Sequence, residues 1–218
     1  MTYIVTGHYG SGKTEFVLNL AKKLAAEGRV TIADLDVINP FFRSRECAAK
    51  LAPLGIDVMG SALDNNTGQD IPALSFAFLS RIRAGEHVII DLAGGENGLK
   101  LLTNCHNAID SYRFFCVFNI YRPETNTPEK MIEFCQMVNA QSPLKLTGLV
   151  NNGNLLALTE STHVLNSQAA VITAGKALGL PLEYTLMQAG IYSEIVDKVL
   201  SEKVLTFTVP LMREAWQG

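Results

Sequence analysis

The chain contains 218 residues, of which 48% are hydrophobic and 18% are charged, a balance typical of a folded α/β protein. This length fits one domain with a large core, so we expect a single domain over residues 1–218. A net charge of −3 gives no overall attraction to nucleic acid, and no uncharged apolar stretch reaches the roughly 18 residues of a membrane helix. The first predicted strand begins at the N-terminus and leaves no room for a signal peptide, so we expect a cytoplasmic protein.

Apolar runs alternate with amphipathic segments along most of the chain. The runs predict strands at residues 3–6, 30–34, 56–59, 87–91, 114–119, 146–151 and 182–186. Helices are expected between them, at residues 13–27, 43–51, 71–84, 98–107, 128–141, 162–178 and 192–203. Residues 206–218 predict a short strand and a tail. Because several strands are continuously apolar, we expect an α/β fold with a mostly parallel central sheet of about seven strands and helices on both faces.

A glycine-rich motif lies between the first predicted strand and the first predicted helix. Residues 7–14 read G-H-Y-G-S-G-K-T, which fits the phosphate-binding pattern G-x-x-x-x-G-K-[ST] in its required strand–loop–helix context. Lys13 should bridge the β- and γ-phosphates of a nucleotide, and the Thr14 hydroxyl should coordinate Mg²⁺. The motif therefore predicts a three-layer P-loop NTPase fold. Its expected nucleotide contacts are Gly7, His8, Tyr9, Gly10, Ser11, Gly12, Lys13, Thr14 and Glu15.

Acidic residues close the second and fourth predicted strands. Asp34 and Asp36 end the second strand, where one carboxylate can support the metal and the other can orient the attacking water. We assign the metal role to Asp34 and the water-orienting role to Asp36. Asp91 ends the fourth strand and should reach Mg²⁺ through water, while the N–H of Gly94 just after it should meet the γ-phosphate. A solvated acidic turn is the alternative at Asp34 and Asp36, and a plain turn at the end of a strand is the alternative at Asp91.

The sixth predicted strand ends in Asn151-Asn152-Gly153-Asn154. An asparagine amide offers both a donor and an acceptor to a purine edge, so Asn151 and Asn152 are candidates for contact with the base. Guanine readers commonly follow their Asn with Lys and, two places further on, Asp, whereas this chain has Asn152 and Asn154 there. The sequence therefore favours ATP over GTP, with a turn that binds no ligand as the alternative.

These elements in this order resemble the MinD/ParA/Mrp group of P-loop ATPases, a branch that also contains the nickel-insertion GTPases. Members of the MinD and ParA type carry a signature lysine after the first glycine of the loop, where this chain has His8. Their dimer-dependent hydrolysis therefore does not transfer directly to this sequence. Arg43, Arg45 and, more weakly, Arg122 are candidates to supply the missing charge, and a solvated helix start is the alternative for Arg43 and Arg45.

The resemblance implies an Mg²⁺-dependent ATP-binding protein, most simply a slow ATPase that acts as a nucleotide-dependent switch for an unidentified protein partner. A nucleotide-dependent homodimer is a further implication. Three alternatives stay open: an ATP-dependent small-molecule kinase or ligase of the dethiobiotin synthetase type, a GTP-using metal-insertion chaperone, and an ATP sensor that does not hydrolyse. The short C-terminal tail contains Pro210 and gives no support for membrane docking, and the sequence carries no clear nucleic-acid signal.

Overall fold

The computed structural model describes residues 1–35, 47–60 and 77–207. Within these ranges, eight strands form one sheet in the order β3-β2-β4-β1-β5-β6-β7-β8, and every neighbouring pair is parallel. The strands are β1 (Thr2–Thr6), β2 (Val30–Leu35), β3 (Ile56–Gly60), β4 (His87–Leu92), β5 (Tyr112–Phe118), β6 (Gly148–Asn151), β7 (Leu182–Gln188) and β8 (Lys203–Phe207). The mostly parallel sheet predicted from the sequence is thereby confirmed.

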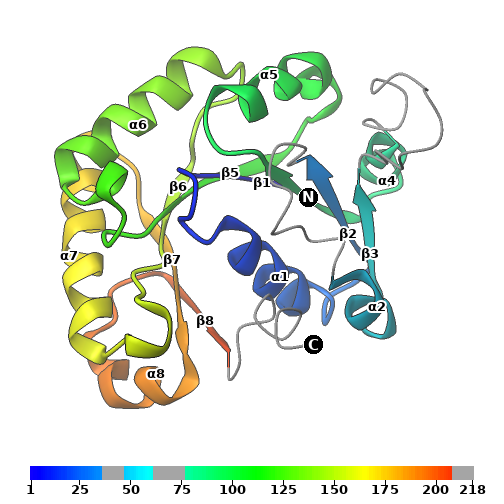
Figure 1. The fold of residues 1–218 in the computed structure, drawn as a ribbon. Helices are drawn as coiled ribbons and strands as arrows, with labels where there is room; N and C mark the ends of the chain where they lie inside the picture. The colour runs from blue at the N-terminus through cyan, green and yellow to red at the C-terminus, as the bar shows by residue number, and fades with distance from the viewer. Residues whose placement is uncertain (36–46, 61–76, 208–218) are drawn as a thin grey trace, which may run out of the picture.

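Helices cover both faces of this sheet, as Figure 1 shows. They are α1 (Lys13–Leu24), α2 (Ala48–Leu51), α4 (Phe78–Arg83), α5 (Glu96–Cys105), α6 (Pro128–Gln141), α7 (Ser161–Leu178) and α8 (Ala189–Ile195). One apolar cluster joins α4, α5, α6 and α7 to the sheet, and a second joins α1 and α2 to the opposite face. Successive residues of a strand therefore enter different clusters, as Ile4 and Val5 do. Burial on both faces explains why these strands read as continuous apolar runs.

The described residues form eight strands, in keeping with the sheet of about seven strands expected, and β8 is an edge strand whose mixture of charged and apolar residues does not read as a buried run. One sequence prediction near the C-terminal end of the described chain was wrong. The helix expected over residues 192–203 ends much earlier, at Ile195, and a short 3₁₀ turn follows. The Gln168 side chain donates to Lys198 O at 3.0 Å and accepts from Leu200 N at 2.8 Å. These bonds use backbone groups that a continuing helix would need.

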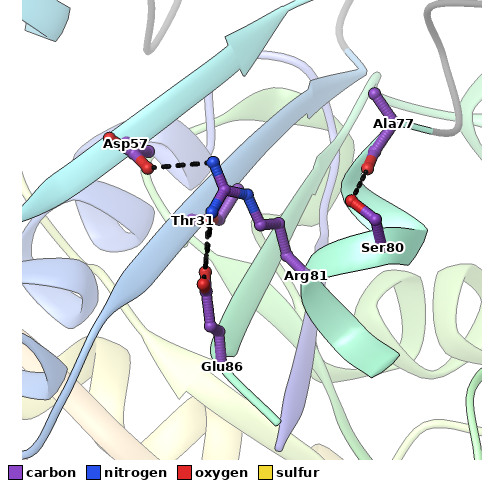
Figure 2. Close-up of polar contacts among 6 residues, drawn as sticks. All are labelled: Thr31, Asp57, Ala77, Ser80, Arg81 and Glu86. Carbon is purple, nitrogen blue, oxygen red and sulfur yellow. Dashed lines mark hydrogen bonds and ion pairs between the residues drawn. The ribbon is translucent and has the colours of Figure 1, made fainter. Parts of the chain in front are cut away.

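A polar cluster fixes α4 beside β2 and β3, at the edge of the sheet that β3 forms (Figure 2). The Arg81 guanidinium pairs with Asp57 Oδ2 at 3.5 Å and with Glu86 Oε1 at 3.2 Å. Glu86 also accepts a hydrogen bond from Thr31 Oγ1 at 3.2 Å. Arg81 therefore connects α4 to β3 and to the residue just before β4.

The buried phenol of Tyr184 predicts a loss of stability at high pH. Burial, followed by the negative charges of Tyr3 and Glu183, raises the pKa of Tyr184 from 10.0 to about 12. Below pH 10 this phenol is protonated in both folded and unfolded chains, and above it the unfolded chain ionises first. The free energy of unfolding should therefore fall between pH 10 and pH 12. Urea unfolding across this range should show a shallower fall for Tyr184→Phe, whereas Tyr9→Phe, which removes an exposed phenol, should keep the wild-type slope.

Candidate functional site

The glycine-rich loop lies at the carboxyl end of β1, between the ends of β4 and β5. Gly10 and Gly12 have φ angles of 74° and 84°, in the left-handed region that glycine adopts at little cost. The N–H of Ser11 donates back to His8 O at 3.1 Å, and α1 begins at Lys13. The loop therefore turns sharply and ends at a helix N-terminus, the arrangement that binds phosphate groups through backbone N–H groups.

Lys13 and Gly94 lie close together at the mouth of this loop. The Lys13 side chain is only 6% exposed, and its Nζ donates to His8 O at 3.4 Å. A Cβ added to Gly94 would lie 3.5 Å from that Nζ and 3.2 Å from the backbone nitrogen of Tyr9. The loop after β4 thus approaches the phosphate loop closely, and a side chain at position 94 would crowd the lysine.

Two of the predicted carboxylates are neighbours. Asp34 of β2 is the register partner of Asp91 of β4, and Asp91 also pairs with Val5 at the end of β1. Their exposed fractions are 4% and 1%. Together with Thr14 in the first turn of α1, these oxygens match the ligand type that Mg²⁺ prefers. Asp36, Arg43 and Arg45 lie outside the described residues.

Asn151 and Asn152 both make hydrogen bonds within the protein. The fully buried Asn151 amide donates to Val164 O of α7 at 3.2 Å and accepts from Gly153 N at 3.1 Å. Asn152 Nδ2 donates to Ser11 O at 2.8 Å, so it braces the phosphate loop directly. Contact of either residue with a base stays a prediction. The structure adds a bracing role for Asn152 that the sequence did not indicate.

The loop after β5 contributes a set of residues that sequence reasoning largely missed. The Asn119 amide donates to Asn154 O at 3.0 Å, and its Oδ1 accepts from Tyr121 N and from Asn154 N. Arg122 Nε donates to Gly10 O at 3.0 Å. Because β5 pairs in parallel with β1, its carboxyl end must lie beside the phosphate loop. A polar residue just after β5 was therefore the signal that could have identified this set.

The His8 ring contacts helix α6. It packs edge-on against Phe134 of α6, with 5.8 Å between the ring centroids. The His8 carbonyl accepts a hydrogen bond from Lys13 Nζ. The next residue, Tyr9, is 60% exposed. His8 therefore anchors the loop to α6, while Tyr9 faces solvent.

The thiol of Cys116 lies beneath this site, at the register partner of Thr6. Burial and hydrogen bonding with Cys135 of α6 raise its pKa well above 9.0, although the positive charge of Lys13 acts in the opposite direction. Cys116 is consequently a neutral thiol at neutral pH. It adds no negative charge under a loop whose geometry suits anions.

The fold is P-loop NTPase-like. It has a parallel sheet with helices on both faces, and a G-x-x-x-x-G-K-T loop follows its central strand β1. Solved structures of the signal recognition particle receptor FtsY share this fold. The protein from Elizabethkingia anophelis matches with a TM-score of 0.57 and 18% identity, over 84% of this chain and 57% of that one. The complex of that protein with GDP matches with a TM-score of 0.59 and 17% identity, over 84% of this chain and 56% of the other. The cell division protein ftsY from Thermotoga maritima matches with a TM-score of 0.58 and 19% identity, over 85% of this chain and 60% of the other.

These likenesses establish the fold. This chain spans less than two thirds of the length of the FtsY chains that it matches. No protein-family model matches the sequence, and no curated protein matches it. Within the described ranges, no helix combines the length and apolar character needed to cross a membrane. The finer resemblance to the MinD/ParA/Mrp group stays a prediction.

Proposed function

We propose that this chain binds a nucleoside triphosphate with Mg²⁺, hydrolyses it slowly and acts as a nucleotide-dependent switch for a protein partner. The observation that carries the proposal is the close approach of Lys13 to the loop after β4. A Cβ on Gly94 would lie 3.5 Å from Lys13 Nζ, so the lysine and the glycine turn after β4 lie next to one another beside the phosphate loop. A terminal phosphate bound there would be sensed by both segments.

Each residue at the edge of the sheet then has a distinct role. Backbone N–H groups of residues 7–13 would hold the phosphates, and the Lys13 ammonium would offset part of their negative charge. Thr14, Asp34 and Asp91 would hold Mg²⁺, which would lower the charge on the bound phosphates. Asp36 is the candidate to orient the attacking water, and it lies outside the described residues.

ATP is the proposed nucleotide. The residues that follow Asn151 are Asn152 and Asn154, in the positions where guanine readers carry Lys and Asp. Neither asparagine has the carboxylate that pairs with the guanine N1 and N2 protons. GTP is the second candidate, because an FtsY structure of similar fold is a complex with GDP.

Calorimetric titration of the full chain with ATP and GTP, with and without Mg²⁺, tests this proposal. We expect ATP to bind more tightly than GTP, removal of Mg²⁺ to weaken binding, and phosphate release to be slow. Tighter binding of GTP would overturn the ATP preference alone. The absence of binding for both nucleotides at millimolar concentration would overturn the proposed function. Light scattering of the ATP-bound chain would show whether it forms the expected homodimer.

A further inference from the structure

Arg122 lies directly on the turn of the phosphate loop, although 112 positions separate it from Gly10. Its Nε donates to Gly10 O at 3.0 Å. A Cβ on Gly10 would lie 3.2 Å from that Nε and 3.4 Å from the Arg122 Cζ. The guanidinium therefore packs against the backbone of the turn, and a side chain at position 10 would crowd it.

The backbone on either side of this arginine is firmly held. Arg122 N donates to Asn119 O at 3.1 Å, and Arg122 O accepts from Thr125 N at 3.0 Å. Its φ and ψ of −105° and 132° are extended, as expected for a residue that precedes a proline. The Tyr121 hydroxyl donates to His163 O at 3.1 Å, which attaches the same loop to α7. Arg122 is thus preorganised over the turn before any ligand arrives.

The chemistry of a guanidinium suits a second task at this place. Arginine keeps its positive charge at all physiological pH values, and its Nη groups carry further donors beyond the Nε that holds Gly10. The His8 ring packs against Phe134 of α6. A polyphosphate held by the loop would lie within the field of the Arg122 charge.

We propose that Arg122 is a polyphosphate-binding residue that fixes the turn of the loop through Gly10 O and adds a positive charge to the phosphate site. This inference rests on the proposed nucleotide binding. The charge should favour ligands with more phosphate groups, because each additional phosphate increases the attraction. Arg122 would therefore set the preference of the site for triphosphates over monophosphates.

The test compares Arg122→Gln and Arg122→Lys with the wild-type full chain, by calorimetric titration with Mg²⁺ and ATP, ADP or AMP. We expect Arg122→Gln to lower the affinity for ATP by about tenfold and the affinity for AMP much less. Arg122→Lys keeps the charge but not the fork of donors, so it should recover part of the loss for ATP. Lys130→Gln is the matched control. Lys130 is an exposed lysine whose Nζ donates to Pro123 O at 2.6 Å on the same loop, so its loss changes the net charge equally.

A residue that only holds the loop would lower the affinity for all three nucleotides to the same extent, and this result would overturn the inference. Equal losses in Arg122→Gln and Lys130→Gln would overturn it as well, because the net charge alone would then explain them. If the wild-type chain binds nucleotide and Arg122→Gln binds it equally well, the inference is wrong while the proposed function stands. If the wild-type chain binds no nucleotide, both are wrong.

Discussion

Lys13→Ala should lower the affinity for a nucleoside triphosphate by about a hundredfold, because charged hydrogen bonds to the phosphates are lost. Lys13 is the buried cation at the mouth of the loop, with its Nζ beside Gly94. A ligand at a hundred times its Kd stabilises a folded protein by about 2.7 kcal/mol. Urea unfolding of the wild-type chain should show a gain of that size with Mg²⁺ and ATP, whereas the variant should show almost none at the same concentration.

Lys22→Ala provides the matched control for this prediction. Lys22 lies on the exposed face of the same helix, α1, so its removal changes the net charge equally and leaves the loop intact. It should retain the full stabilisation by nucleotide. Lys13→Ala should still fold, because the bonds from Ser11 N to His8 O and from Asn152 to Ser11 O hold the loop without the lysine. A Lys13→Ala variant with normal affinity would contradict the assignment of the site.

Gly12→Ala should destabilise the folded chain by about 3 kcal/mol and abolish nucleotide binding. Two effects combine at this position. Gly12 has a φ of 84°, which a Cβ disfavours, and that Cβ would lie 2.1 Å from Asn152 Nδ2. Relief of the clash would require Asn152 to leave Ser11 O, and the loop would then lose its brace. Urea unfolding gives the stability, and calorimetry gives the affinity.

Gly85→Ala separates these two effects. Gly85 has a similar φ of 77°, but nothing lies within 4 Å of an added Cβ. In this control the free energy of unfolding should fall only by the cost of backbone strain, about 1 kcal/mol. If Gly12→Ala and Gly85→Ala lower the free energy of unfolding equally, Asn152 does not restrict position 12. The double variant Gly12→Ala with Asn152→Ala should recover part of the difference, since it removes the amide from the clash.

Local patterns in the sequence predicted most of the fold. The helix over residues 128–141 is confirmed with both of its bounds, because the pair Thr127-Pro128 marks its start and its apolar stripe faces the sheet. Most strands are confirmed within a few residues for a similar reason, since burial on both faces gives them a continuous apolar run. The edge strand β8 lacks that burial, so its sequence carries only a weak signal.

The sequence predicted the candidate site unevenly. The phosphate loop and the neighbouring positions of Asp34 and Asp91 follow from a motif and from the ends of parallel strands, which meet at one edge. The contacts of Asn152 with Ser11 and of Arg122 with Gly10 depend on how three loops pack together. No local pattern encodes such packing. The same limit applied to His8, whose direction is set by Phe134 on a distant helix.

The hydrogen bond from Asn152 to Ser11 also constrains the order of folding. It joins residues 141 positions apart, and β5 lies between the two strands that it connects. The brace can form only after β6 has docked beside β5, and contacts between such distant residues form slowly. During refolding, the competent phosphate loop should therefore arise late, after most of the sheet has assembled.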